Sequence, residues 1–262
     1  MPHTILERSI KYCFSNIKNL IFILALIFLI DFLNQTSIIY LNTPYFFVLL
    51  IIITILTLIT TGYGLIVSRD VIEGGKELPK VYIKDSIVFG LKSTITIIIF
   101  STVQIIILEF IAVFFNFATF EMEEFVLNIL GEISLFINQD PVQTVLFFIL
   151  SIIVFYITMF FMEISLARLA YEGSLRKSLD LFYIKDCIDV IGWRKYAKDY
   201  TNIIIAIAIL TYLKYGIESF HIIDGIADLI IGFLIFTIEY LGIGEIYKLY
   251  KEKSETTQNE LK

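Results

Sequence analysis

The sequence predicts an all-α polytopic membrane protein, in which six transmembrane helices form three hairpins and an interfacial amphipathic helix precedes each hairpin. Of the 262 residues, 58% are hydrophobic and 18% are charged, and the mean hydropathy is +0.84. Soluble domains are typically about 45–50% apolar and about 25% charged. A soluble fold of this length could not bury so much apolar surface, so lipid must solvate part of it.

Six apolar runs define the expected spans, because each is close to the roughly 20 residues that a helix needs to cross the hydrocarbon core. All four prolines lie outside these runs, where a missing backbone N–H does least damage to a helix in lipid. We expect one transmembrane domain over residues 1–250 and a disordered cytoplasmic tail over 251–262. The spans are expected at about residues 17–39, 45–67, 91–117, 142–162, 201–215 and 226–247.

The basic residues predict the orientation of the chain in the cell membrane. Every Lys and Arg except Lys214 lies in one of four segments, which alternate with segments that contain none. Because cytoplasmic loops are enriched in Lys and Arg, both termini are expected in the cytoplasm. The four basic segments are 1–19, 68–92, 163–200 and 248–262.

A short motif before three of the spans indicates an internal repeat. YIKDSIVFG at 82–90 resembles YIKDCIDVIG at 183–192, and IKYCFSNIKN at 10–19 is a fainter third copy. Each copy has apolar residues on one side and charges on the other, which is typical of a helix lying in the membrane interface. Chance is the alternative, since Ile-Lys pairs recur in a chain so rich in both residues.

The segment EGGKELPKVYIKD at 73–85 is the most loop-like part of the chain. Gly74, Gly75 and Pro79 form the expected linker turn, since glycine and proline end helices and turn the chain. We interpret this segment as a joint between two spans rather than a reactive loop.

Residues that carry common catalytic or metal chemistry are sparse. The two histidines, His3 and His221, and the two cysteines, Cys13 and Cys187, show no metal-ligand or redox spacing. We therefore expect no catalytic, cofactor-binding or metal-binding residues, no cofactor and no enzymatic activity. The GYG and GIG runs at 62–64 and 242–244 are interpreted as places where helices approach closely or as helix ends near the surface.

Three acidic residues within the spans are the candidate intramembrane polar sites: Asp31, Glu109 and Glu239. A carboxylate at the bilayer centre costs about 2.5–3.5 kcal/mol on insertion scales, so it is a functional hypothesis by default. These groups would bind a cation or relay protons. Alternatively, they lie near the interfaces and reach water by snorkelling.

Two further surfaces bear on partners. The acidic residues of the segment 120–137 alternate with apolar ones at helical spacing, which predicts an amphipathic helix that contacts lipid or a partner. Anionic lipid head groups are candidate partners of a basic set that the positive-inside rule would also place there. The set is Arg168, Arg176, Lys177, Arg194, Lys195 and Lys198.

The run from Gly62 to Lys92 resembles an uncharacterised, mainly archaeal membrane family, the domain-of-unknown-function family 4013. The similarity rests on Gly62, Arg69, the turn at 75–79 and Gly90–Leu91–Lys92, with a looser match at RLAYEGS, 168–174. It extends over roughly residues 5–250. After Pro79 the family usually has an acidic, aromatic stretch, from which this chain departs. The resemblance implies a fold and an archaeal source but no assigned activity.

These observations lead to two hypotheses about function. The first is a non-enzymatic membrane scaffold or accessory that acts on lipid or on partner subunits. The second is a transporter of small solutes or ions that uses the intramembrane carboxylates. Expected partners are membrane lipids and a partner subunit or second copy of the chain, with no nucleic acid.

Overall fold

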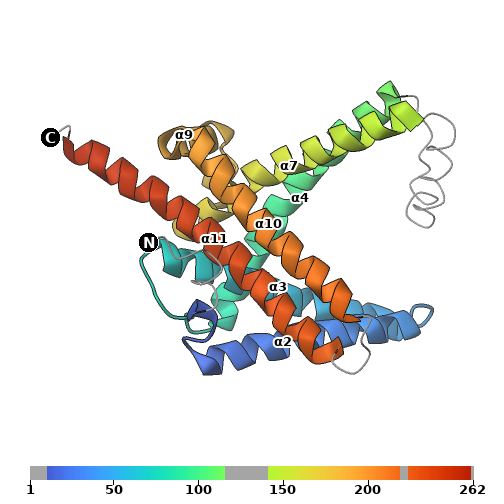
Figure 1. Ribbon diagram of the computed structural model, residues 1–262. Coiled ribbons are helices and arrows are strands. Elements are labelled where there is room, and N and C mark those ends of the chain that lie inside the picture. Colours follow the sequence, from blue (N-terminus) through green and yellow to red (C-terminus); the bar gives the residue numbers. More distant parts are fainter. Residues whose placement is uncertain (1–10, 116–140, 219–223, 261–262) are drawn as a thin grey trace. The chain divides into compact units, whose positions relative to one another are not determined.

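A computed structural model describes residues 11–115, 141–218 and 224–260 (Figure 1). The regular secondary structure of these residues is helical, without strands, which confirms the all-α prediction. The expected amphipathic helix at 120–137 lies outside the described residues.

Five of the described helices are long and apolar enough to cross a membrane, which confirms the membrane class. The fifth expected span, 201–215, lies in α10 (Trp193–Glu218), which is not among these five. Two shorter helices, α8 (Leu175–Ser178) and α9 (Leu181–Ile191), precede α10. The five are α2 (Ile17–Ile39), α3 (Pro44–Ile72), α4 (Ile83–Phe114), α7 (Pro141–Glu172) and Leu229–Thr256 within α11 (Asp224–Glu260).

Short polar residues and glycines define the helix ends. Asn16 caps α2 by accepting a hydrogen bond from the backbone N–H of Asn19, and Asp180 caps α9 in the same way. Pro44 occupies the first turn of α3, where its missing N–H costs nothing. Gly74 and Gly173 follow α3 and α7 with positive φ, the conformation that commonly ends a helix.

The two YIKD segments adopt different structures. Residues 83–90 form the first turns of the continuous helix α4, whereas 183–191 belong to the separate helix α9. The apolar side of α9 (Ile184, Cys187, Ile188 and Ile191) is buried, and α9 packs against α10 and α11. The apolar side of α9 therefore packs against other helices of the protein. In an isolated interfacial helix, the same side would contact lipid.

The chain forms two compact units, and each is described by itself. The first comprises Met1–Thr96 and Glu163–Lys262, and the second comprises Ile97–Met162. In the first unit α11 contacts α2, α3, α9 and α10. A buried hydrogen bond from Ser68 Oγ to the carbonyl oxygen of Tyr240, 2.6 Å long, joins α3 to α11.

The glycines of the GYG and GIG runs lie at close contacts of the first unit. A Cβ atom at Gly62 would overlap the backbone of Ser86 and Gly90, and one at Gly64 would overlap the ring of Tyr240. In α11, Gly242 faces Ile203 and Gly244 faces Ser68. The interpretation of these runs as close-approach sites is confirmed.

The helix α11 continues to Glu260, whereas disorder was expected from residue 251. Lys253 explains part of this difference, because its Nζ donates hydrogen bonds to the carbonyl oxygens of Val190 and Ile191. These are terminal carbonyls of α9, which have no partner within their own helix. A contact with α9, which is distant in sequence, thus holds the beginning of the polar tail in place.

Candidate functional site

The linker between α3 and α4 is held by side chains from the N-terminal part of the chain. The backbone N–H of Leu78 donates to Ser15 Oγ, and Asn19 Nδ2 donates to the carbonyl oxygens of Leu78 and Pro79 at 3.1 and 2.9 Å. The hydroxyl of Tyr63 donates to the same Pro79 oxygen at 2.9 Å. The N–H and carbonyl groups of Leu78 and the carbonyl group of Pro79 are therefore satisfied by the protein, as expected of a structural joint.

The glycines of this turn have distinct tasks. Gly74 adopts a φ angle of +92°, which residues with a side chain rarely adopt. A Cβ at Gly75 would overlap the carboxylate of Asp70, which accepts a 2.8 Å hydrogen bond from the hydroxyl of Tyr12. Burial, followed by this hydrogen bond, raises the pKa of Tyr12 above its ordinary value, so the phenol stays protonated and donating.

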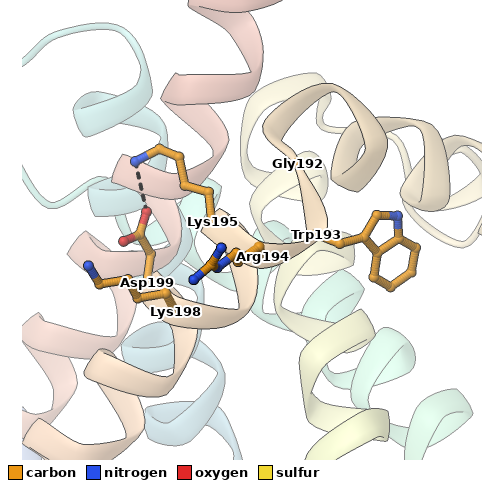
Figure 2. A pocket seen from close by; sticks show the side chains of 6 residues that line it. All are labelled: Gly192, Trp193, Arg194, Lys195, Lys198 and Asp199. Carbon is orange, nitrogen blue, oxygen red and sulfur yellow. Dashed lines mark hydrogen bonds and ion pairs between the residues drawn. The ribbon is translucent and has the colours of Figure 1, made fainter.

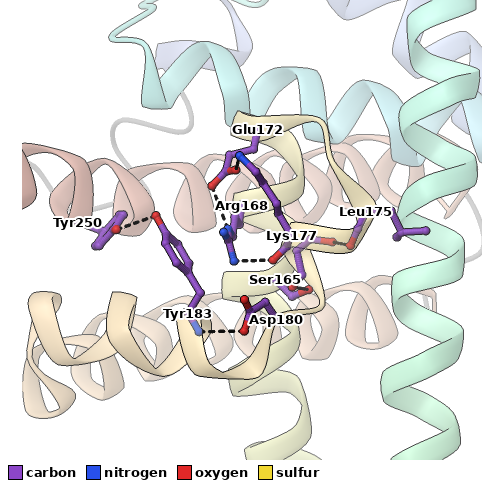
Figure 3. Close-up of polar contacts among 9 residues, drawn as sticks. Ser165, Arg168, Glu172, Leu175, Lys177, Asp180, Tyr183 and Tyr250 are labelled. Carbon is purple, nitrogen blue, oxygen red and sulfur yellow. Dashed lines mark hydrogen bonds and ion pairs between the residues drawn. The ribbon is translucent and has the colours of Figure 1, made fainter.

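A buried arginine organises the linker after α7 (Figure 3). Arg168 Nε lies 2.9 Å from Glu172 Oε1, and its Nη1 donates to the carbonyl oxygen of Lys177. The guanidinium carbon lies 3.3 Å from the ring centroid of Tyr183, whose hydroxyl is 2.7 Å from that of Tyr250. Because Arg168 is buried and its guanidinium contacts protein groups, it is not available to lipid head groups, in contrast to the expectation from sequence.

Two further side chains hold the same linker. Ser165 Oγ donates to the carbonyl oxygen of Ser178 at 2.7 Å. Lys92 Nζ, near the start of α4, donates to the carbonyl oxygen of Gly173 at 2.6 Å. Both linkers are thus tied by side chains that bind their carbonyl oxygens, which rigidifies these backbone segments.

An open hollow of about 680 Å³ lies at the junction of α9 and α10 (Figure 2). Its lining residues share one segment of sequence, and four of their side chains are exposed: Trp193, Arg194, Lys195 and Lys198. Lys195 Nζ pairs with Asp199 at 3.2 Å. Among the described residues, Arg194 and Lys198 form no ion pair. The lining residues are Gly192, Trp193, Arg194, Lys195, Lys198 and Asp199.

The indole of Trp193 is oriented by a hydrogen bond from its Nε1 to Asp189. Asp189 also accepts from Lys185 at 2.7 Å. The hydrogen bonds from Lys185 and then Trp193 lower the pKa of Asp189, so it remains an anion and an acceptor at neutral pH. Trp193 is therefore held in a defined orientation at the edge of the hollow.

The three candidate carboxylates differ in exposure and in the unit to which they belong. Asp31 on α2 and Glu109 on α4 are exposed, and they belong to different units. Glu239 on α11 is half-buried and interacts electrostatically with Glu163 of α7. Glu163 is 9% exposed, and its Oε2 has no hydrogen-bond partner within the described part of the chain. Sequence reasoning missed this pair because the two residues are far apart along the chain.

No three His, Cys, Asp or Glu side chains of the described residues lie close enough to hold a metal ion. The cysteines Cys13 and Cys187 are free thiols, and both are fully buried. Burial raises the pKa of Cys13 to about 11 and that of Cys187 to about 12.

We expect neither native thiol to react with a membrane-impermeant maleimide at pH 7, from either side of the membrane. The thiolate is the reactive form. The raised pKa values keep both groups protonated until the pH approaches 11 to 12. Mass spectrometry should find no adduct in the folded protein and two adducts after denaturation. Labelling of the folded chain at neutral pH would contradict this burial.

The long apolar helices define a membrane-embedded protein of the all-helical class. The chain belongs to the family described as "Protein of unknown function (DUF4013)", whose model matches residues 45–238. This match confirms the resemblance inferred from the glycine and proline turn. No curated protein and no solved structure matches the chain.

Proposed function

We propose that this protein is a non-enzymatic membrane scaffold or accessory, which acts on lipid or on partner subunits. The observation that supports the proposal most is the exposure of the apolar faces of α4 and α7. Phe110, Phe114 and Ile152 have exposed fractions of 73%, 81% and 67%. Within a bilayer, such faces contact either lipid tails or the helices of another subunit.

The linkers add to this proposal. Their carbonyl oxygens are bound by Asn19, Lys92 and Arg168, so the spans are connected by rigid segments. Rigid connections suit a scaffold that presents fixed surfaces. The basic hollow beside Trp193 remains open to a partner.

The proposal is tested by extracting the protein from native membranes in polymer nanodiscs and identifying what remains bound. We expect a lipid class or a protein subunit to be retained in a fixed ratio, above its level around an unrelated six-span protein from the same membranes. Retention of no lipid or protein above that level would contradict the proposed function.

We further propose that both termini lie in the cytoplasm of a cell-membrane protein. The buried native thiols cannot report orientation, so exposed positions are used instead. With Lys80→Cys, we expect maleimide labelling in intact cells only after permeabilisation. With Asn42→Cys, in the segment between α2 and α3, labelling should occur from outside. The reverse pattern would invert the topology.

A transporter is the second candidate, and the interaction of Glu163 with Glu239 is the observation that favours it. Two interacting carboxylates on different spans, one buried and one half-buried, are suited to hold a proton or a cation. Asp31 and Glu109, being exposed, are less suited to this task.

Flux measurements in proteoliposomes distinguish these two functions. As a scaffold, the wild-type protein should conduct protons and monovalent cations no faster than empty vesicles, and Glu163→Gln and Glu239→Gln should change nothing. Proton- or cation-linked flux that is lost in these two variants and retained in Glu109→Gln would support the transporter instead.

A further inference from the structure

The hollow at the start of α10 has an unusual combination of features for a solvated surface. It contains three cationic side chains but one carboxylate, Asp199, which is already paired with Lys195. Figure 2 shows this pair on one side of the hollow and the indole of Trp193 on the other, with Arg194 between them. The charges of Arg194 and Lys198 are therefore left for an external anion.

The face of α10 that carries these two cations continues as an apolar surface. At 100° per residue, Arg194, Lys198, Ile205 and Ile209 lie within about 60° of one another around the helix. Ile205 and Ile209 are exposed by 50% and 55%. The same strip of α10 thus begins with two cations and continues with exposed isoleucine side chains.

The length of this strip matches one leaflet of a bilayer. From Lys198 to Ile209 the helix rises by about 16 Å, at 1.5 Å per residue. One leaflet contributes about half of the roughly 30 Å hydrocarbon thickness. A molecule with an anionic head and acyl chains of leaflet length fits both parts of the strip, whereas a free anion fits the first part alone.

We propose that the hollow formed by Gly192–Asp199 binds the phosphate-bearing head group of an anionic phospholipid, with Arg194 and Lys198 as its cationic contacts. The acyl chains lie along Ile205 and Ile209. Trp193 lies at the interface level, where tryptophan is enriched in membrane proteins. The inference rests on the proposed function, because it names the lipid class on which the scaffold acts.

Trp193 allows a direct test, because it is the one tryptophan of the whole chain. Its fluorescence therefore reports on this hollow alone. The full-length protein is reconstituted in phosphatidylcholine vesicles with increasing brominated phosphatidylglycerol or, separately, brominated phosphatidylcholine, since bromine quenches tryptophan at short range. We expect stronger quenching by the anionic lipid. Equal quenching by the two lipids would overturn the proposal.

In the double variant Arg194→Gln with Lys198→Gln, the preference for the anionic lipid over phosphatidylcholine should fall. The expected decrease is up to roughly fivefold for each cation removed. The selectivity should also fall with salt, as the screening length shortens from about 10 Å at 0.1 M to about 3 Å at 1 M. Both side chains are exposed, so the variant should fold; unchanged helix content and tryptophan emission in pure phosphatidylcholine verify this. The charge-retaining variant Arg194→Lys with Lys198→Arg should keep the selectivity.

A matched control separates a site from general charge attraction. Lys80→Gln with Lys84→Gln removes the same charge from exposed positions just before α4 and in its first turn, and it should leave the quenching selectivity unchanged. An equal loss in this control would overturn the site. Millimolar inorganic phosphate should not relieve the quenching; if it did, the occupant would be a free anion rather than a lipid.

Failure of this inference is distinguishable from failure of the proposed function. If the double glutamine variant at Arg194 and Lys198 still retains its lipid or partner in nanodiscs, with unchanged quenching selectivity, the hollow is not the binding site and the scaffold proposal stands. If the wild-type protein retains neither lipid nor partner, the proposed function itself fails.

Discussion

Replacing Arg168 by methionine is expected to lower the free energy of unfolding by about 3 kcal/mol, the lower part of the range for breaking a buried ion pair. The side chains of Arg168 and Glu172 are 5% and 16% exposed, so water cannot replace the lost guanidinium well at Glu172 in the variant. The carbonyl oxygen of Lys177 also loses its donor, and Tyr183 loses the stacked guanidinium. The effect stays near the lower limit because Lys177 Nζ, 2.7 Å from Glu172, remains as a counter-ion.

The matched control for this substitution is Arg69→Met. Arg69 and Glu73 form an ion pair with the same spacing and a distance of 3.0 Å, but their side chains are 49% and 51% exposed. Exposed pairs contribute at most about 1 kcal/mol. The measurement is unfolding in mixed micelles, combined with the rate of proteolysis in the segment 173–182. Equal losses in the two variants would show that burial does not strengthen the Arg168 pair.

Replacing Gly62 by alanine is the second substitution with a large expected effect, a loss of about 1–3 kcal/mol from overpacking. A Cβ at this position would collide with the backbone of Ser86 and Gly90 on α4. Backbone atoms of a helix cannot rotate out of the way as a side chain does, so the helices must move apart. Gly90 faces the backbone of Leu58 in the same contact, so Gly90→Ala should act similarly. The two effects should not add, because both separate the same helices.

Gly232→Ala is the control for the glycine substitutions. Gly232 lies in α11, and a Cβ there would have no atom within 4 Å. Alanine is favoured over glycine in a helix by about 1 kcal/mol, so this variant should be neutral or slightly more stable. Thermal unfolding of the three variants in one detergent provides the comparison. A comparable loss at Gly232 would mean that helix contacts do not explain the Gly62 result.

The elements of the fold were largely predictable from local patterns. Apolar runs located five helices that are long enough to cross a membrane, and the turn at Gly74, Gly75 and Pro79 was placed between α3 and α4. The ends of helices were less predictable. The continuation of α11 to Glu260 involves Lys253, which binds the last turn of α9. A polar segment read in isolation contains no sign of such a partner.

The candidate site was less predictable than the fold. Asp31, Glu109 and Glu239 were selected for their position within apolar runs, which indicates depth but not direction around a helix. The structure exposes the first two and brings Glu239 near Glu163. Similarly, Arg168 and Arg194 were grouped as basic residues of one linker, although the first is buried and the second is exposed.

By itself, the sequence determined that this is a lipid-solvated helical protein of its family. The reason is that bilayer thickness and backbone hydrogen bonding impose run lengths that can be counted along the chain. Only the tertiary structure decided which polar groups are engaged within the protein and which remain open. Tyr250 reaches Tyr183, and Lys92 reaches Gly173, from segments far apart in sequence. Long-range contacts of this kind engage Arg168 internally, whereas Arg194 and Lys198 stay accessible to a lipid head group.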